Sequence, residues 1–230
     1  MNVRHVFETP QATADACARE ILQRLSESIA LNGRATLAVS GGSTPRMMFD
    51  VMTKIDFDWA KLHLFWVDER PVPPDHKDSN FRMTQEALLS RVSPGSVHRI
   101  LGELPPAEAA ERYRQDLQQF FDGPPIFDIV HLGMGSDAHT ASLFPGLPEI
   151  EDREGMAASV WVDKLATHRI TLLPKAILDS RQVVMLVCGT DKAVPLDRVF
   201  NDPYDPLRLP TQLVHRNASL VDWFLDRAAQ

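Results

Sequence analysis

Short apolar runs alternate along this chain with segments in which apolar residues recur every three or four positions. The runs have the length of buried strands, and they cover residues 36–40, 62–67, 127–132, 168–172, 183–187 and 220–224. Alternating strands and helices predict an α/β fold: a three-layer, mostly parallel, Rossmann-like open sheet with helices on both faces. No repeat, low-complexity tract or linker interrupts the pattern, so residues 1–230 are expected to form a single domain.

Capping signals place the ends of the predicted helices. Thr9 and Pro10 suit an N-cap and a first helical turn, and Gly33 is a typical stop, so one long helix is expected between them. The other predicted helices are at residues 45–54, 79–89 and 106–121, with a helical turn at 174–178. Residues 149–163 carry charge without periodicity and are expected to form a surface excursion.

Charge and cysteine usage limit the partners and the compartment. The formal net charge is −7 without an offsetting basic run, which argues against nucleic acid and anionic membranes but leaves room for a small phosphorylated ligand. Cys17 and Cys188 lie in apolar patterns and suit buried free thiols in a reducing compartment. With no signal-peptide core at the amino terminus and no run of membrane-spanning length, a cytoplasmic location is expected.

The richest stretch for chemistry covers residues 128–145. Its apolar run stops at Gly133 and Gly135, and Asp137 and His139 follow directly, before a short helical signal. Open α/β sheets bind ligands at the carboxyl ends of their strands, and histidine titrates near neutrality. A lone histidine is more often structural than catalytic, but this position makes His139 a candidate general base. Asp137 either orients it or only shapes its turn.

A second motif, SGGSTP, follows the first predicted strand and contains Gly41, Gly42, Ser43 and Thr44. Glycines let the backbone approach an anion, and Thr44 before a proline resembles an N-cap, so the free N–H groups of the next helix are candidate phosphate donors. The motif is neither a Walker A loop nor GxGxxG. An ordinary capped turn is the alternative.

Charged residues follow three further predicted strands. Asp68 and Arg70 are expected on one side of a strand end, with Glu69 facing away and Asn80 aimed at the same pocket. Arg169 begins a strand and Lys192 begins a helix. Each cation alone is weak evidence, but together with SGGSTP they can form a phosphate clamp. No metal-ligand set emerges.

In this order, SGGSTP, DER with a downstream SN, GMGxDxHTASLFP, RIT and GxxK resemble the 6-phosphogluconolactonase family over residues 40–192. Glucosamine-6-phosphate deaminases of the same superfamily are similar in fold and phosphate loop. They carry an acid-containing segment after the equivalent histidine, where this chain has residues 140–145, TASLFP. The missing carboxylate argues against deaminase chemistry.

The resemblance implies hydrolysis of 6-phospho-D-glucono-1,5-lactone in the oxidative pentose phosphate pathway, without cofactor or metal. It implies that His139 activates water and that Ser43, Thr44, Arg169 and Lys192 hold the phosphate. Asp68, Arg70 and Asn80 would line the sugar site, with Arg70 stabilising the oxyanion. A deaminase or isomerase of this fold and a catalytically silent sugar-phosphate sensor are the alternatives. The assembly is expected to be a monomer or a small homo-oligomer.

Three positions depart from the family pattern. Ala138 stands where glycine is common, and a positive φ there would cost about 1–2 kcal/mol. His168 stands where proline is frequent before the arginine. Pro195 falls inside the helix expected after Lys192, which it should shorten or kink unless it lies in the first turn.

Overall fold

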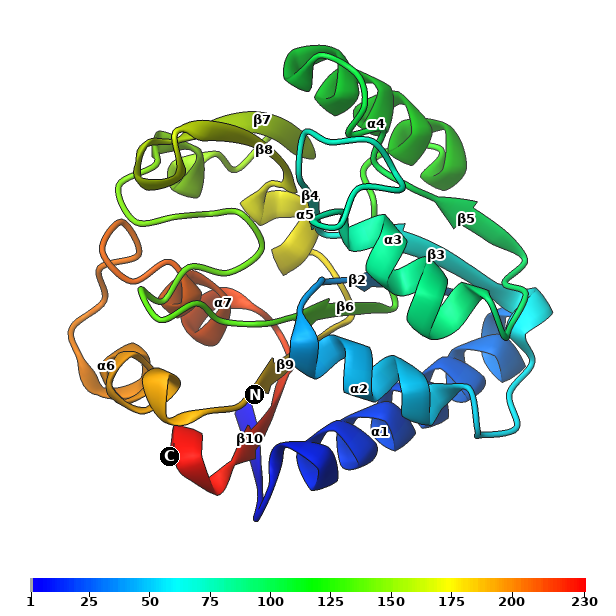
Figure 1. Cartoon of the computed structure of the whole chain (residues 1–230), viewed down its shortest axis with the longest axis horizontal. Helices are drawn as coiled ribbons and strands as arrows, with labels where there is room; N and C mark the ends of the chain where they lie inside the picture. The colour runs from blue at the N-terminus through cyan, green and yellow to red at the C-terminus, as the bar shows by residue number, and fades with distance from the viewer. Residues whose placement is uncertain (1) are drawn as a thin grey trace.

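The computed structural model describes residues 2–230, which contain a central seven-stranded sheet whose strand pairs are all parallel (Figure 1). Its order from one edge to the other is β1 (Asn2–Phe7), β10 (Val221–Asp226), β9 (Gln182–Val187), β6 (Ile129–Leu132), β2 (Ala35–Val39), β3 (Leu62–Trp66) and β5 (Ser96–His98). Every residue of β2, β6, β9 and β10 is buried, as expected of a parallel sheet covered on both faces. The predicted α/β class and parallel sheet are confirmed.

Helices surround this sheet on both faces (Figure 1). They are α1 (Pro10–Asn32), α2 (Ser43–Met52), α3 (Asn80–Thr84), α4 (Pro106–Phe121), α5 (Pro174–Leu178), α6 (Ala193–Asn201) and α7 (Thr211–Asn217). The predicted caps of α1 are confirmed, because the Thr9 side chain accepts from the Ala12 N–H at 3.2 Å and Gly33 ends the helix with φ 76°. The helix predicted at 79–89 is α3 followed by a π-helical turn, Gln85–Leu89.

The strand order reverses between β2 and β6. From β2 the chain moves outward through β3 to β5, whereas from β6 it moves in the opposite direction through β9 to β10. The loops that leave β2 and β6 therefore diverge and open a crevice at the carboxyl ends of these strands, the usual ligand position in open α/β sheets.

A second, three-stranded sheet consists of β4 (Asp68–Glu69), β8 (Thr167–Leu172) and β7 (Ala157–Val162), paired antiparallel. The strand predicted at 168–172 is present but lies in this sheet, not in the parallel one. The expected surface excursion at 149–163 is wrong over its second half, which is β7. Buried Ala157, Val160 and Val162 pack inward there, and the charged residues before them obscured this pattern.

Two strands of the large sheet lie outside the predicted set. In β1 exposed and half-buried residues alternate, and β5 has three residues and no buried side chain, so neither presents an apolar run. The helical signal after His139 is also wrong, because residues 140–147 form turns around a Thr140–Leu143 bridge. Ala141 has φ 49°, which a right-handed helix does not allow.

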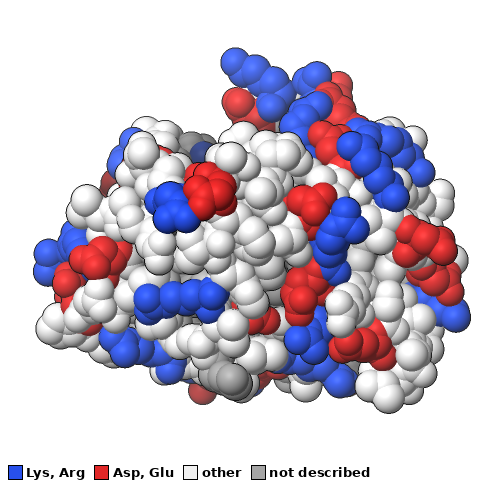
Figure 2. All heavy atoms as spheres, turned by 90° about the horizontal axis from the view of Figure 1, so that it is seen from below, with Lys and Arg blue, Asp and Glu red and all other residues white. Residues whose placement is uncertain are grey.

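Charge is distributed rather than concentrated on the face seen from below in Figure 2. Lys and Arg side chains are interspersed there with Asp and Glu, around a broad uncharged area. Among residues 2–230, no helix combines the length and the apolar character needed to cross a membrane.

Candidate active site

A cleft of about 290 Å³ lies at the switch point of the parallel sheet. It brings together residues from the loops after β2, β4, β6 and β9, which are far apart in the sequence. Its lining includes the predicted residues Gly41, Gly42, Ser43, Thr44, Asp68, Arg70, Asn80, His139 and Lys192. Asp137 and Arg169 do not line it. Asp137 lies behind His139, and Arg169 lines an adjoining pocket together with Arg70.

The loop after β2 presents the N-terminus of α2 to this cleft. The helix begins at Ser43, so Gly42 is the N-cap and Thr44 is in the first turn; the predicted N-cap role of Thr44 is wrong. The first helical turn tolerates Pro45 because its N–H groups have no intrahelical acceptor. The Arg46 N–H already donates to Gly42 O at 3.1 Å, which leaves the Ser43 and Thr44 N–H groups for an anion.

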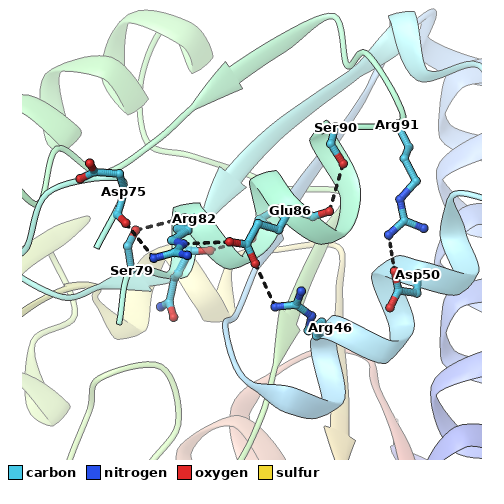
Figure 3. A network of polar contacts seen from close by, with 10 residues as sticks. Arg46, Asp50, Asp75, Ser79, Arg82, Glu86, Ser90 and Arg91 are labelled. Atoms are coloured by element: carbon cyan, nitrogen blue, oxygen red, sulfur yellow. Dashed lines mark hydrogen bonds and ion pairs between the residues drawn. The ribbon is translucent and has the colours of Figure 1, made fainter. Parts of the chain in front are cut away.

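Gly41 allows α3 to approach the loop closely. A Cβ at Gly41 would lie 1.8 Å from Asn80 Oδ1, so only glycine fits beside this amide. Surface ion pairs join α2 to the segment that follows it in space, residues 80–91 (Figure 3). Arg46 of α2 donates to Glu86 at 3.2 Å, and Asp50 of α2 pairs with Arg91. Glu86 also accepts from Arg82 of its own segment at 2.8 Å. Exposed pairs of this kind stabilise little individually.

The loop after β6 holds His139 against Asp137. The Asp137 carboxylate accepts from the imidazole Nδ1 at 2.5 Å and from the His139 N–H at 3.2 Å, and the ring stacks on Phe144 with centroids 4.1 Å apart. A Cβ at Gly135 would lie 2.0 Å from His139 Nδ1, so glycine makes this ring position available. With Nδ1 bound to the carboxylate, Nε2 is the nitrogen available for proton transfer.

Asp137 is ionised in this arrangement. Partial burial raises the pKa of Asp137. Hydrogen bonds from His139 and Lys164 lower it by more than burial raises it, so the net pKa lies well below the usual aspartate range. The Asp137 carboxylate therefore contacts both the ring and the backbone of His139.

Ala138 has a left-handed backbone, with φ 61°, so the cost considered for a positive φ at this position applies. The residue is fully buried, and its carbonyl accepts from the Thr211 N–H at 3.0 Å and from the Thr211 hydroxyl at 2.8 Å. These bonds from the first residue of α7 hold the unfavourable backbone, so the loop keeps its turn without glycine.

Asp68 and Asn80 form the buried polar wall of the cleft. The Asp68 carboxylate accepts from the Ser142 hydroxyl at 2.7 Å and from Asn80 Nδ2 at 3.2 Å. The same Nδ2 donates to Asp68 O at 2.9 Å. Within the described residues the buried Asn80 Oδ1 has no hydrogen-bond partner, and it lies against Gly41.

Glu69 faces away from the cleft, as predicted, but its importance was missed. Its carboxylate is buried and accepts from the N–H groups of Arg70, Asn80 and Phe81, each at 2.8 Å, and from the Ser79 hydroxyl at 3.0 Å. Desolvation raises the pKa of Glu69 against these bonds. Glu69 thus closes the loop 70–81 that carries Arg70 and Asn80, and nothing local in the sequence indicates it.

The two cations of the predicted clamp, Arg169 and Lys192, line different pockets. Lys192 ends the turn Thr190–Lys192 before α6 and lines the cleft, where it pairs with Asp191 at 2.8 Å. Pro195 lies in the first turn of α6, the one helical position where it was expected not to shorten or kink the helix, and α6 is intact. Arg70 borders both pockets, and its Nε is buried with no hydrogen-bond partner among residues 2–230.

Cys188 also lines the cleft, whereas Cys17 is fully buried. Burial raises the pKa of the Cys188 thiol to about 11, so it is protonated at neutral pH and is a poor nucleophile. This thiol therefore does not offer a covalent route.

His131 of β6 lies beside the start of the SGGSTP loop. It is fully buried, its carbonyl accepts from the Ser40 hydroxyl at 3.1 Å, and desolvation lowers its pKa to about 3. A folded-state pKa below the unfolded value means that the unfolded chain binds the proton first, so stability is present above about pH 6.5 and is lost as pH falls.

We expect the free energy of unfolding to fall by roughly 2 kcal/mol between pH 7 and pH 5 through His131 alone. Urea denaturation of the wild type and of His131→Gln at both pH values measures this. The variant should show a correspondingly smaller difference. An equal difference in both proteins would exclude His131 as the cause.

The fold and the cleft define a class of α/β proteins in which a glycine-rich helix N-terminus faces a His–Asp pair across the switch point of a parallel sheet. A family model described as glucosamine-6-phosphate isomerases/6-phosphogluconolactonase matches residues 8–223. This chain belongs to that family.

Three individual proteins illustrate what this chain is similar to. The chain is 38% identical over 216 residues to a 6-phosphogluconolactonase of a Nostoc species, covering 91% of this chain and 89% of that protein. The crystal structure of a 6-phosphogluconolactonase from Shewanella baltica superposes with a TM-score of 0.89 at 31% identity and covers 98% of both chains. A monomeric glucosamine-6-phosphate deaminase shares the fold, with a TM-score of 0.84, at 18% identity over 99% of this chain and 98% of that one.

Proposed function

We propose that this chain is a 6-phosphogluconolactonase, which hydrolyses 6-phospho-D-glucono-1,5-lactone to 6-phosphogluconate in the oxidative pentose phosphate pathway. The observation that carries the proposal is the meeting of the α2 N-terminus, Lys192 and the His139–Asp137 pair around one cleft. Such a cleft suits a ligand with a phosphate at one end and a bond to be hydrolysed at the other. The family membership and the named relatives support the same substrate.

The reaction needs one base and one stabilised oxyanion. His139 Nε2 takes a proton from water, and the hydroxide adds to the lactone carbonyl carbon, whose oxygen becomes the oxyanion near Arg70. The tetrahedral intermediate then collapses and breaks the bond to the ring oxygen, which receives the proton from the imidazolium. The resulting acid loses its proton to solvent. An activated ester of this kind requires no covalent nucleophile, metal or cofactor.

The binding roles follow the positions of the side chains. Ser43, Thr44 and Lys192 bind the phosphate, while Asp68 and Asn80 bind the sugar hydroxyls. Arg169 lies beyond Arg70, outside the main cleft, so we assign it a weaker, supporting part in anion binding. The partner is thus a small phosphosugar lactone. A single domain, a cytoplasmic location and a monomer or small homo-oligomer stay predictions.

The nearest alternative is the deaminase reaction on glucosamine 6-phosphate, which releases ammonia. Residues 140–145 supply no carboxylate to this cleft, and Thr140 and Ser142 of that segment are bound to Gly133 O and Asp68. Parallel assays should show consumption of the phosphorylated lactone above its spontaneous rate and no ammonia from glucosamine 6-phosphate. Ammonia release with an unaccelerated lactone would reverse the assignment.

We expect Lys192→Ala to raise KM for the phosphorylated lactone by roughly 10- to 100-fold, since a charge-assisted hydrogen bond contributes about 1.5–3 kcal/mol. KM for unphosphorylated gluconolactone should not change. Arg169→Ala is the matched comparison and should have a smaller phosphate-specific effect. Equal effects of Lys192→Ala on both substrates, or a larger effect of Arg169→Ala, would contradict this placement of the phosphate.

A further inference from the structure

Lys164 lies in the turn that connects β7 and β8 of the small sheet. Val162 pairs with Thr167 at the end of the ladder, and the turn Asp163–Leu165 closes it with Ala166 at φ 48°. A hydrogen bond of 2.8 Å from Trp161 Nε1 to the Asp163 carboxylate braces the tip. The hairpin therefore delivers a lysine to a fixed point above the loop that carries His139.

The Lys164 ammonium contacts both groups that hold the His139 ring. Its Nζ forms an ion pair with Asp137 Oδ2, the oxygen that His139 does not use. The same Nζ lies 4.5 Å from the centroid of the Phe144 ring, a cation–π contact, and Phe144 is the ring on which His139 stacks. One cation thus fixes the carboxylate on one side of the imidazole and the aromatic ring on another.

We propose that Lys164 is a positioning residue for His139 and not a substrate ligand. With both Asp137 oxygens bound, the carboxylate cannot rotate, so the imidazole keeps its Nδ1 on Asp137 and its Nε2 toward the cleft. Lys164 also neutralises part of the carboxylate charge that His139 contacts. The ion pair is half exposed, so orientation is its main effect.

Other ionisable groups share the cleft with His139 and are unchanged by a substitution at Lys164. Asp68 and Arg70 approach from the end of β4, Lys192 from the turn before α6, and Cys188 from the end of β9, and all line the cleft with His139. A change in pH dependence on replacement of Lys164 alone therefore reports its own charge.

The test is Lys164→Met, assayed on the phosphorylated lactone over pH 5 to 9. We expect kcat to fall about 10-fold through lost orientation. The acid limb of the kcat/KM profile should move upward by about 0.5–1 pH unit, since a nearby positive charge is gone. Lys164→Arg should restore both. Lys61→Met, which removes an equally exposed lysine paired with Asp58 at 3.1 Å, should change neither.

Two results would overturn the inference. One is an unchanged kcat and pH profile in a folded Lys164→Met protein, or in Lys164→Gln if the methionine variant does not fold. The other is a raised KM with kcat and the pH profile unchanged, which would make Lys164 a substrate ligand.

The inference rests on the proposed function, and an NMR titration of the His139 ring separates the two. Its titration midpoint should be higher in Lys164→Met than in the wild type, whether or not the lactone is turned over. If the wild type is an active lactonase and the midpoint in Lys164→Met is the same as in the wild type, only the proposed role of Lys164 is overturned. If the midpoint is higher in Lys164→Met but the wild type does not hydrolyse the lactone, only the proposed lactonase function is overturned.

Discussion

We expect His139→Ala to lower kcat for the phosphorylated lactone by about 10²–10⁴-fold, with KM nearly unchanged. The His139 imidazole is held by a carboxylate at 2.5 Å with its second nitrogen available, and the proposed phosphate-binding groups lie on different loops. Removing it takes away proton transfer in the transition state while leaving ground-state binding. Initial rates corrected for spontaneous hydrolysis measure this effect.

His168→Ala is the matched control. His168 lies on β8, contacts the Ser159 hydroxyl at 3.1 Å and the Trp161 ring, and does not line the cleft. Its replacement should leave kcat unchanged. If His139→Ala keeps the wild-type kcat, another group is the base and the mechanism is wrong, even though the lactonase function would stand.

We expect Glu69→Ala to lower the free energy of unfolding by about 3–5 kcal/mol. The substitution leaves three backbone N–H groups and the Ser79 hydroxyl without the acceptor that they share. It also frees the loop that carries Arg70 and Asn80, so the remaining folded protein should bind substrate more weakly. Denaturant unfolding followed by circular dichroism measures the loss of stability.

Glu86→Ala supplies the control for this experiment. Glu86 has two arginine partners, Arg46 and Arg82, but its side chain is 41% exposed (Figure 3). In the alanine variant, water can solvate the two arginines in place of the carboxylate. We expect a change of no more than about 1 kcal/mol. Equal losses of stability in the two variants would show that burial and the backbone donors are not what makes Glu69 important.

Local signals in the sequence predicted much of the fold. The bounds of α4 and α5 are those expected, and α1 has the predicted cap and stop, because proline, glycine and apolar periodicity act over a few residues. The four fully buried strands were found for a similar reason: a strand covered on both faces must be apolar throughout. Their carboxyl ends then placed the cleft.

What the sequence did not reveal depends on residues that are distant in the chain. The two edge strands β1 and β5 have few apolar neighbours to bury, so they carry no apolar run. The role of Glu69 depends on donors about ten positions ahead, and that of Lys164 on a carboxylate 27 positions away. Arg169 starts a predicted strand, but that strand belongs to the small antiparallel sheet, and Arg169 lines a second pocket.

The comparison of kcat/KM for phosphorylated and unphosphorylated gluconolactone with the wild-type protein tests the central claim most directly. We expect kcat/KM to be higher for the phosphorylated lactone by a factor on the order of 10² or more, because Lys192 and, more weakly, Arg169 are proposed to contact the phosphate. Both rates should be proportional to protein concentration. Consumption of the phosphorylated lactone no faster than in buffer, or equal kcat/KM for the two lactones, would contradict the account.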